Sequence, residues 1–385
     1  MKILFAVHTY YPDNNGFQKV TEYLAEGLSK QNEVAIITSS KSEYAVKEEH
    51  NGILIYRIET INRGFEFIGD RERYFRIIEE FNPEIFVCVC VQSWPFDWIK
   101  EKINLLKCKT VLYTHGASGL NDKYPLLKDL LGGHLKAFSY HFYWKKYYKN
   151  AYAYMKFFDR IIYLAEGDNL YQYAISHGLK NGRILGNAVD EDLFCEYKGK
   201  KDEKIKYIYI SNYDDNKNQK AVLRAYYEAN IINSEMVFAG GQDKQYFDEL
   251  VFLNSELGKE FGYENRVTLL FGVSRDVIKK LFKESDVFVL GSKKETYSLV
   301  LCEAAASGKA IISTDVGIAN ELPGCYVVEN FNEMKEKMEL LANNKQLIDK
   351  AARSLKEYAE NNFRIDKKIE VFDNIIYELV GKKND

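Results

Sequence analysis

The chain has 385 residues, of which 46% are hydrophobic and 28% charged, and its formal net charge is −3. This length exceeds the size at which one hydrophobic core usually divides, so two domains are expected. The composition can build packed cores, and the nearly balanced charge argues against a protein that binds nucleic acid through bulk charge.

The six cysteines show neither a CxxC pair nor metal-ligand spacing, which favours reduced thiols. The apolar start Met1–Val7 is interrupted by His8 too early for a signal peptide. No run of about 18 apolar residues occurs, so no membrane-spanning helix is expected. The cytoplasm is therefore the simplest location.

In the first half of the chain, short runs rich in β-branched and aromatic residues predict strands that alternate with helical patterns. After the first run, Gln18–Lys30 repeats apolar residues at four-residue spacing, as an amphipathic helix does. The predicted strands are Ile3–Val7, Val34–Ile37, Ile53–Ile58, Ile85–Val91, Thr110–Tyr113 and Arg160–Leu164.

A second series of strands begins after the charged stretch Glu196–Lys204, and the tail from Asn332 to Leu379 is predicted to be helical. The strands of this series are Tyr207–Ile210, Met236–Ala239, Val267–Phe271, Val287–Leu290, Ala310–Ser313 and Cys325–Val328. Such alternation predicts an α/β protein with two doubly wound parallel sheets, joined near residues 190–204. Ligands of these sheets bind beyond the carboxyl ends of the strands.

The most informative segment follows the predicted strand Val287–Leu290 and carries two glutamates eight positions apart, Glu295 and Glu303. A strand, a polar loop and a helix start offer unpaired N–H groups and a positive helix end to an anion. Two carboxylates beside such a place suit a nucleotide sugar, which has a central diphosphate and hydroxyl-rich groups at both ends. The alternative is an ordinary strand–helix unit with two solvated glutamates.

Several segments, in this order, resemble those of the family-4 glycosyltransferases, and the resemblance covers nearly the whole chain. Glu295 and Glu303 match the E-x7-E motif of that family. The other matching segments are Tyr10–Gly16 at the start, Asn187–Phe194 between the domains, Ala304–Gly308, and Val316–Glu321, in which Ile318 replaces a glycine.

The resemblance implies a GT-B fold, with two Rossmann-like doubly wound parallel-sheet domains facing each other across a cleft. Residues 1–190 would form the acceptor-side domain and residues 191–364 the nucleotide-sugar domain. A C-terminal helix over about residues 365–385 would pack back on the first domain. No cofactor and no metal are expected, because the nucleotide sugar is a substrate and no Asp-x-Asp motif follows a strand.

Carried over to this sequence, the family pattern assigns the donor-sugar hydroxyls to Glu295 and the ribose hydroxyls to Glu303. An ionised carboxylate is a good acceptor for both tasks. The loop after Glu295 would lie against the sugar and phosphates through its backbone N–H groups. Its residues are Thr296, Tyr297, Ser298 and Leu299, and Ser298 stands where the family usually has a glycine.

The predicted diphosphate clamp departs from the family pattern. Lys217 matches the lysine of that clamp, although read alone it could be a solvated lysine, whereas Asn212 replaces the arginine. Losing a bidentate cation removes an interaction worth about 1.5–3 kcal/mol, so either another cation compensates or donor binding is weaker. Gly240, Gly241, Gly272 and Val273 match the loops around the phosphate and the base.

Two residues of the first domain complete the predicted site. Gly16 lies between the first strand and the first helix, where backbone N–H groups can approach a phosphate or the acceptor. His115 follows the strand Thr110–Tyr113, where the family has a histidine at the reaction centre, although a lone histidine is often structural. We therefore predict His115, Glu295 and Lys217 as catalytic residues.

The stretch His134–Arg160 carries basic and aromatic side chains against a single acid, Asp159. A basic, aromatic, amphipathic helix can lie in a bilayer interface beside anionic headgroups. Alternatively, residues 134–160 form a core helix whose lysines point to water. Many family members use lipid-linked acceptors, which favours peripheral contact at the inner face of the membrane.

The resemblance to this family implies a retaining, metal-independent glycosyltransferase of the hexosyltransferase type. Its partners would be a UDP- or GDP-sugar donor and a glycan or lipid-linked saccharide acceptor, in the synthesis of capsule or lipopolysaccharide. A non-catalytic nucleotide-sugar binder or partner subunit of the same fold is the alternative, made conceivable by Asn212. No nucleic acid is expected as a partner.

Overall fold

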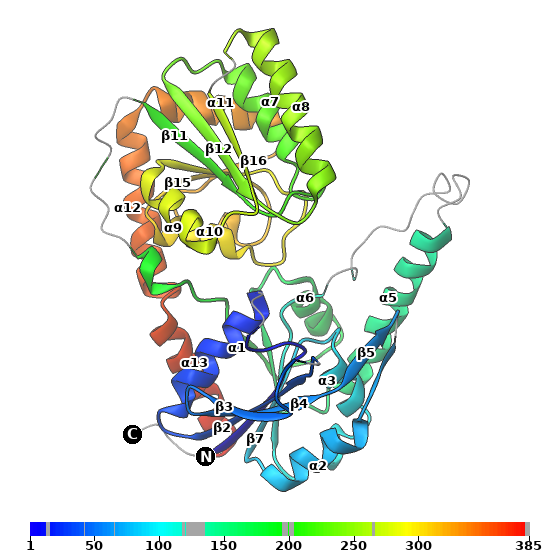
Figure 1. The fold of residues 1–385 in the computed structure, drawn as a ribbon. Coiled ribbons are helices and arrows are strands. Elements are labelled where there is room, and N and C mark those ends of the chain that lie inside the picture. The colour runs from blue at the N-terminus through cyan, green and yellow to red at the C-terminus, as the bar shows by residue number, and fades with distance from the viewer. Residues whose placement is uncertain are drawn as a thin grey trace. The chain divides into compact units, whose positions relative to one another are not determined.

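The computed structural model describes residues 1–12, 16–41, 43–64, 66–117, 120, 135–194, 199, 204–263 and 266–381. Its contacts divide the chain into two compact units, each built around one large β-sheet (Figure 1). Unit 1 comprises Met1–Gly186 together with the chain from Lys368 onward, and unit 2 comprises Asn187–Lys367. The predicted link near residues 190–204 lies partly outside the described residues.

The large sheet of unit 1 has the order β10-β9-β8-β7-β1-β2-β4-β3, and it is parallel except for β3, which runs antiparallel to β4. A separate antiparallel pair joins β5 and β6. The strands are β1 (Lys2–Ala6), β2 (Glu33–Ser39), β3 (Lys47–His50), β4 (Ile53–Ile58), β5 (Thr60–Arg63), β6 (Glu66–Gly69), β7 (Ile85–Val89), β8 (Lys109–Tyr113), β9 (Arg160–Tyr163) and β10 (Gly182–Ile184).

The helices of unit 1 follow these strands, and α13 returns from the C-terminal part of the chain. They are α1 (Gly16–Ser29), α2 (Arg71–Phe81), α3 (Trp94–Ile99), the short η1 (Ile103–Leu105), α5 (Leu135–Met155), α6 (Asn169–Ser176) and α13 (Ile365–Leu379). The ring of Phe372 on α13 stacks on that of Phe5 in β1, at 6.0 Å between centroids. The C-terminal helix is thereby fixed to the sheet of unit 1.

The centre of this sheet is apolar on both faces, because helices cover both sides of a parallel sheet. Every residue of β7 is buried, and Leu4, Phe86, Leu112 and Ile161 on four neighbouring strands have no exposed surface. Burying one such side chain stabilises the fold by roughly 1.5–3 kcal/mol. These strands form a rigid platform for the loops at their carboxyl ends.

The predicted strand Ile85–Val91 is too long. In the structure β7 ends at Val89, because Cys90 adopts the left-handed backbone conformation, with φ 69°. A residue other than glycine in this conformation is strained, and such positions gather at functional sites. Cys90 lies at the carboxyl edge of the sheet, and its N–H donates to the carbonyl of Tyr113 at 2.8 Å.

Unit 2 holds one six-stranded sheet, which is wholly parallel and has the order β13-β12-β11-β14-β15-β16. Its strands are β11 (Ile205–Ile210), β12 (Ser234–Gly240), β13 (Val267–Phe271), β14 (Val287–Leu290), β15 (Ala310–Thr314) and β16 (Tyr326–Val328). Its helices are η2 (Glu191–Leu193), α7 (Gln219–Ala229), α8 (Lys244–Phe261), α9 (Arg275–Glu284), α10 (Leu299–Ala306), η3 (Ala319–Glu321), α11 (Phe331–Ala342) and α12 (Lys345–Asn362).

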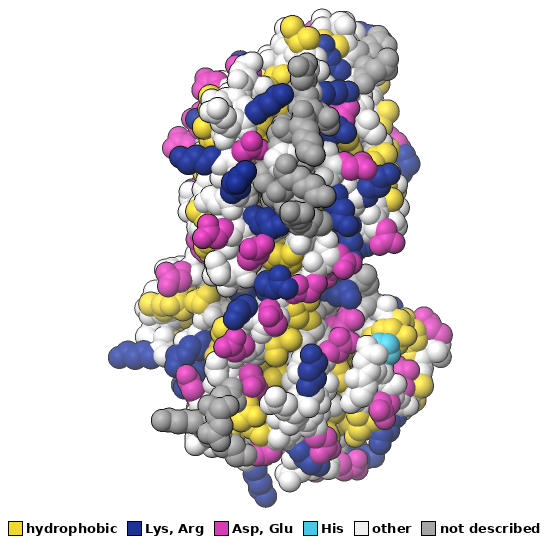
Figure 2. All heavy atoms as spheres, turned by 90° about the vertical axis from the view of Figure 1, so that its left-hand side faces the viewer, with side chains coloured by type: hydrophobic (Ala, Val, Ile, Leu, Met, Phe, Trp, Pro, Cys, Tyr) yellow, Lys and Arg dark blue, Asp and Glu magenta, His cyan; other side chains and the backbone are white. Residues whose placement is uncertain are grey.

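Charged side chains of both signs are interspersed over the face of the molecule shown in Figure 2, and this face carries no continuous basic patch. None of the described helices is both long and apolar enough to cross a membrane. The described cysteines, Cys88, Cys90, Cys108, Cys302 and Cys325, are free thiols.

Candidate functional site

The sheet of unit 2 has a switch point between its neighbouring strands β11 and β14. From β11 the chain proceeds to β12 and β13 on one side, and from β14 to β15 and β16 on the other. At such a point the loops leave the strands in opposite directions and leave room for a ligand at the carboxyl edge. The two loops are Ser211–Asn218 and Gly291–Ser298, and we call the place where they meet the switch-point site.

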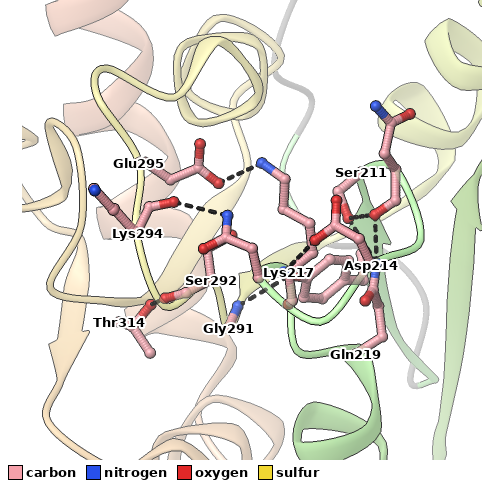
Figure 3. A network of polar contacts seen from close by, with 12 residues as sticks. Ser211, Asp214, Lys217, Gln219, Gly291, Ser292, Lys294, Glu295 and Thr314 are labelled. Carbon is pink, nitrogen blue, oxygen red and sulfur yellow. Dashed lines mark hydrogen bonds and ion pairs between the residues drawn. The ribbon is translucent and has the colours of Figure 1, made fainter. Parts of the chain in front are cut away.

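Hydrogen bonds of backbone groups and of the Asn216 side chain fasten these two loops to each other, and part of this network is drawn in Figure 3. The N–H of Lys293 donates to the carbonyl of Asn216 at 2.7 Å, and the Asn216 amide donates back to the carbonyl of Lys294 at 3.0 Å. Below them, the Tyr209 hydroxyl donates to the carbonyl of Lys217 and accepts from the N–H of Gly291. The loops therefore hold their side chains in a fixed relation.

Lys217 and Glu295 form an ion pair across the switch point, with 2.5 Å between Nζ and Oε1 (Figure 3). Their side chains are 21% and 12% exposed, so water screens this pair less than it screens a surface pair. A lysine ammonium has three protons to donate. Lys217 can therefore keep Glu295 in place while it donates to a second anion.

The loop after Glu295 is strained where it enters α10. Ser298 has φ 68° and ψ 82°, and its hydroxyl is buried without a hydrogen-bond partner in the structure. Gly317 packs closely against this loop, since a Cβ at Gly317 would lie 2.6 Å from the carbonyl oxygen of Tyr297. Tyr297 and Ser298 are buried, whereas Thr296 is exposed. Strain held in place by such packing is typical of functional loops.

No side chain caps the start of α10, which follows Ser298. The first N–H groups of a helix lack intrahelical partners and carry the positive end of the helix dipole. The start of α10, including the N–H of Leu299, is therefore suited to an anion at the same edge as Lys217.

Glu303 on α10 is paired with Arg275, a residue that the sequence reasoning missed. Arg275 is the first residue of α9, and its guanidinium contacts the Glu303 carboxylate and lies 3.4 Å from that of Asp190. The Glu303 side chain is only 5% exposed. Burial raises the pKa of Glu303, and the positive charge of Arg275 opposes this rise.

The charges around Glu303 alternate in sign. Lys279, one turn after Arg275 on α9, contacts Asp190 at 3.8 Å and Asp192 at 2.8 Å. Asp190 therefore stands between two cations, and Arg275 stands between two carboxylates. The sequence does contain a signal for Arg275. This cation directly follows the loop Gly272–Ser274 and begins α9, so it lies at the same edge of the sheet as that loop.

The remaining predicted loops of unit 2 lie along the same carboxyl edge, after β12 and β13. The N–H of Gly272 donates to the carbonyl of Gly240 at 2.7 Å, and that of Tyr213 donates to the carbonyl of Gly241 at 2.8 Å. A Cβ on Gly240 would lie 1.8 Å from the carbonyl oxygen of Ser211, so only glycine fits there. Val273 continues the Gly272 loop towards Arg275.

Asn212 is exposed in the loop after β11, and its backbone carbonyl accepts from the Gln219 amide at 2.7 Å. Its own side-chain amide is neutral, so this position supplies no charge for an anion. The positive charge of this loop therefore comes from Lys217, which lies 2.5 Å from Glu295.

Unit 1 contains the other two predicted residues, both at the carboxyl edge of its own sheet. Gly16 is the first residue of α1. His115 follows β8 with φ 52°, and its ring lies 4.1 Å from that of Tyr113. Burial lowers the pKa of His115 to about 3, so its imidazole is neutral at physiological pH. A neutral imidazole can exchange a hydrogen bond with a hydroxyl but adds no positive charge.

Within the described part of the chain, no group of three or more histidine, cysteine, aspartate or glutamate side chains is arranged to hold a metal ion. The positive charge at the switch-point site comes from Lys217, and that around Glu303 comes from Arg275 and Lys279.

The part of the chain that carries the switch-point site is similar to a known protein family. Residues 191–362 match the family described as Glycosyl transferases group 1. The chain is 28% identical over 235 residues to the N-acetyl-alpha-D-glucosaminyl L-malate synthase of Bacillus anthracis, covering 54% of this chain and 59% of that protein. The first three curated relatives are matched over only 24%, 59% and 42% of their own lengths.

Solved structures match the chain over almost its full length. Sucrose-phosphate synthase of Thermosynechococcus elongatus has a TM-score of 0.74 at 13% identity, with 99% of each chain covered. HepE of Anabaena, solved in complex with UDP-glucose, has a TM-score of 0.71 at 14% identity, with 99% of this chain and 100% of that chain covered. These likenesses confirm the predicted α/β fold of the GT-B type.

Proposed function

We propose that this chain, whose residues 191–362 form a Glycosyl transferases group 1 domain, is a retaining glycosyltransferase that uses a nucleotide sugar as donor. The observation that carries the proposal is the pairing of Lys217 with Glu295 at the switch point, beside the open start of α10. This arrangement sets a cation for phosphate next to a carboxylate for sugar hydroxyls. Buried Glu303, which is paired with Arg275, supplies a second carboxylate from within α10.

In the proposed reaction, Lys217 and the first N–H groups of α10 bind the diphosphate and stabilise the charge that grows on it as the sugar leaves. Glu295 accepts hydrogen bonds from the sugar hydroxyls, and Glu303 accepts them from the ribose. No metal is needed for this step, because the cation and the helix start carry the charge. The acceptor attacks from the face that the diphosphate leaves, and the leaving phosphate takes its proton, so the anomeric configuration is retained.

A UDP-sugar is the donor that we favour over a GDP-sugar. The HepE structure, which matches this chain over its whole length, contains UDP-glucose. A glycan or lipid-linked acceptor is supported by a second relative, which is 28% identical over 41% of this chain. It is the N,N'-diacetylbacillosaminyl-diphospho-undecaprenol alpha-1,3-N-acetylgalactosaminyltransferase of Campylobacter jejuni. We therefore propose a role in the synthesis of a surface polysaccharide such as capsule or lipopolysaccharide.

Sugar transfer without a metal, and with retention, is the expected activity. The purified chain should hydrolyse a UDP- or GDP-sugar slowly, or transfer its sugar, in the presence of excess EDTA. An NMR time course should show a product with the anomeric configuration of the donor. Activity that disappears with EDTA and returns with magnesium or manganese would contradict metal independence. If the chain binds nucleotide sugar but neither transfers nor hydrolyses it, the alternative of a non-catalytic partner subunit holds.

The role of Arg275 predicts a pH-dependent defect in nucleotide binding. Replacing Arg275 by Met removes the charge that lowers the pKa of buried Glu303, so this pKa rises further above its usual value. Less Glu303 is then ionised at pH 6, and each pKa unit corresponds to about 1.4 kcal/mol. Calorimetric titration with UDP should therefore give a larger Kd at pH 6 than at pH 8 in Arg275→Met.

The matched control is Lys279→Met, which removes a cation of the same helix that contacts Asp190 and Asp192. It should increase the pH dependence of UDP binding over that of the parent less than Arg275→Met does, because Lys279 is the weakest of the neighbouring charges that act on the pKa of Glu303. An equal pH dependence in the parent and in Arg275→Met would mean that Arg275 does not set the ionisation of Glu303.

We further propose that α5 brings the chain to the cytoplasmic face of a membrane. One face of this helix packs in unit 1 through Tyr147, Tyr148 and Ala151, whereas Lys146 and Lys149 are exposed. Phe142, whose side chain is 56% exposed, lies one turn before Lys146 on the same helix. Apolar and basic groups on one surface favour an anionic bilayer interface.

Changing Lys146 and Lys149 together to Glu should weaken binding to anionic vesicles, since each basic residue near such a surface contributes about 1 kcal/mol. Co-sedimentation with vesicles containing phosphatidylglycerol measures this, and high salt should reduce it in the parent. Lys30 and Lys107, exposed elsewhere on unit 1, provide the control pair. Equal sedimentation of both double variants and the parent would leave α5 as a core helix with solvated lysines.

A further inference from the structure

A pocket of about 390 Å³ opens in unit 1, and β6, α3 and α5 supply most of its lining residues. We call it the aromatic pocket, and four rings line it: Phe67, Trp98, Tyr143 and Tyr147. Its charged lining residues are Glu66, Arg71, Asp97, Lys100 and Glu101. A larger hollow of about 810 Å³ includes Lys109 and Thr110 at the amino end of β8, and so lies at the edge away from the predicted chemistry.

The walls of the aromatic pocket are fixed by hydrogen bonds. The Trp98 indole N–H donates to the carbonyl of Phe67 at 3.1 Å, and Arg71 donates to the carbonyl of Trp98 at 2.9 Å. The Tyr147 hydroxyl lies 2.6 Å from the carbonyl oxygen of Val91 and 3.0 Å from Oδ1 of Asp97. Because these groups are already placed, little ordering is needed when a ligand binds.

The lining chemistry is suited to a neutral ligand with apolar faces and many hydroxyls. Aromatic rings present flat apolar surfaces, and ionised carboxylates accept hydrogen bonds from hydroxyl groups. Lys100 donates to Oδ1 of Asp97 at 2.7 Å, and the Tyr147 hydroxyl lies 3.0 Å from the same oxygen. These two contacts leave Oδ2 of Asp97 for another donor. Three carboxylates face two cations in the lining, which disfavours phosphate and other anions.

The aromatic pocket borders the carboxyl edge of the unit 1 sheet. The Phe67 ring contacts that of His8 at 5.4 Å between centroids, and His8 follows β1. Val91, which anchors Tyr147, follows β7. Because the chain leaves β1 and β7 towards opposite sides of the sheet, these two strands flank its switch point. A molecule held in the pocket would therefore extend towards the edge that carries His115.

We propose that the aromatic pocket binds a neutral saccharide ring of the acceptor, and so sets which acceptor the enzyme uses. This inference rests on the proposed glycosyltransferase function. Saccharide rings have flat C–H faces that can pack on the half-buried rings of Phe67 and Tyr143. They also have hydroxyls that can donate hydrogen bonds to the Asp97 carboxylate. The pocket thereby becomes a subsite separate from the donor residues of unit 2.

The tryptophans of the chain make this proposal directly measurable. All three lie in unit 1, and Trp98 lines the pocket. The ring of Trp94 is 4.7 Å from that of Trp98, and the ring of Trp144 is 5.2 Å from that of Tyr143. Tryptophan emission should change saturably with maltose or chitobiose, with a Kd in the millimolar range, about 1–10 mM, as expected for a single subsite.

Tyr143→Ala should weaken this binding by about tenfold or more, which corresponds to 1.4 kcal/mol. Tyr154→Ala changes a half-buried tyrosine of the same helix outside the pocket lining, and should bind as the parent does. With a transferable acceptor, Tyr143→Ala should raise the acceptor KM and leave the donor KM unchanged. Tyr143→Leu repeats the test with an apolar side chain retained, and melting curves check that each variant folds.

UDP titration of the same proteins separates this proposal from the proposed function. If UDP binds but neither disaccharide alters the emission of the parent, the aromatic pocket is structural and the proposal is wrong, while the proposed function stands. Equal disaccharide binding by the parent and both Tyr143 variants also overturns it. If UDP and UDP-sugars do not bind, the proposed function itself fails.

Discussion

Replacing Glu295 by Ala is expected to lower kcat by roughly 10²–10³-fold, the loss typical when one positioned polar group is removed from a reacting centre. In the proposed mechanism this carboxylate holds the donor sugar while charge develops, so its contacts matter most in the transition state. The change also leaves Lys217 without the partner that lies 2.5 Å away. Steady-state transfer or donor hydrolysis by the purified variant measures the effect.

Glu303→Ala provides the contrast, because the ribose contacts proposed for it are made in the ground state and the transition state alike. It should chiefly raise the donor KM. Glu295→Gln keeps the shape of the side chain and removes its charge, so it should lie between the parent and Glu295→Ala. Near-normal turnover in Glu295→Ala would remove Glu295 from the reacting centre.

Replacing Gly240 by Ala is expected to destabilise unit 2 by about 3 kcal/mol, because overpacking against rigid backbone is among the costlier substitutions. The new Cβ would lie 1.8 Å from the carbonyl oxygen of Ser211, so the loops after β11 and β12 would have to separate. These loops carry Lys217 and Gly241, so donor binding should weaken as well.

Gly241→Ala is the matched control, since no atom lies within 4 Å of a Cβ at that position. Melting followed by circular dichroism reports both units, whereas tryptophan fluorescence follows unit 1 alone, because all three tryptophans lie there. A lower melting temperature by circular dichroism with unchanged fluorescence melting is the expected pattern for Gly240→Ala. Equal melting of the two glycine variants would show that the loops can relax.

The central strands could be predicted from the sequence because they are buried on both faces. The predicted bounds of β14, which is buried throughout, agree with the structure, as do those of β4 and of the half-buried edge strand β13. The edge strand β3 could not be predicted, because its residues, Lys47–His50, are polar and gain their conformation by pairing with β4. The β5–β6 pair and the short β10 likewise lack an apolar run, so tertiary pairing decides their structure.

The donor residues of unit 2 could be named from motifs, but their contacts could not. The side chains of Lys217 and Glu295 come from loops 78 positions apart, and only the strand order places them together. Arg275 was missed for the same reason, because it reaches Glu303 from a different helix, 28 positions away. The conformation of Ser298 is also a tertiary effect, imposed by the packing of Gly317 on Tyr297.

Hydrogen–deuterium exchange with and without UDP or GDP tests most directly whether the switch-point site binds the donor. Exchange should be slower in Ser211–Asn218 and in the loop and helix start Gly291–Glu303 when a nucleoside diphosphate is present. Lys217→Met should abolish this protection at the same nucleotide concentration. If neither loop is protected at saturating UDP and GDP, or if Lys217→Met leaves the protection unchanged, the switch-point site does not bind the donor through Lys217.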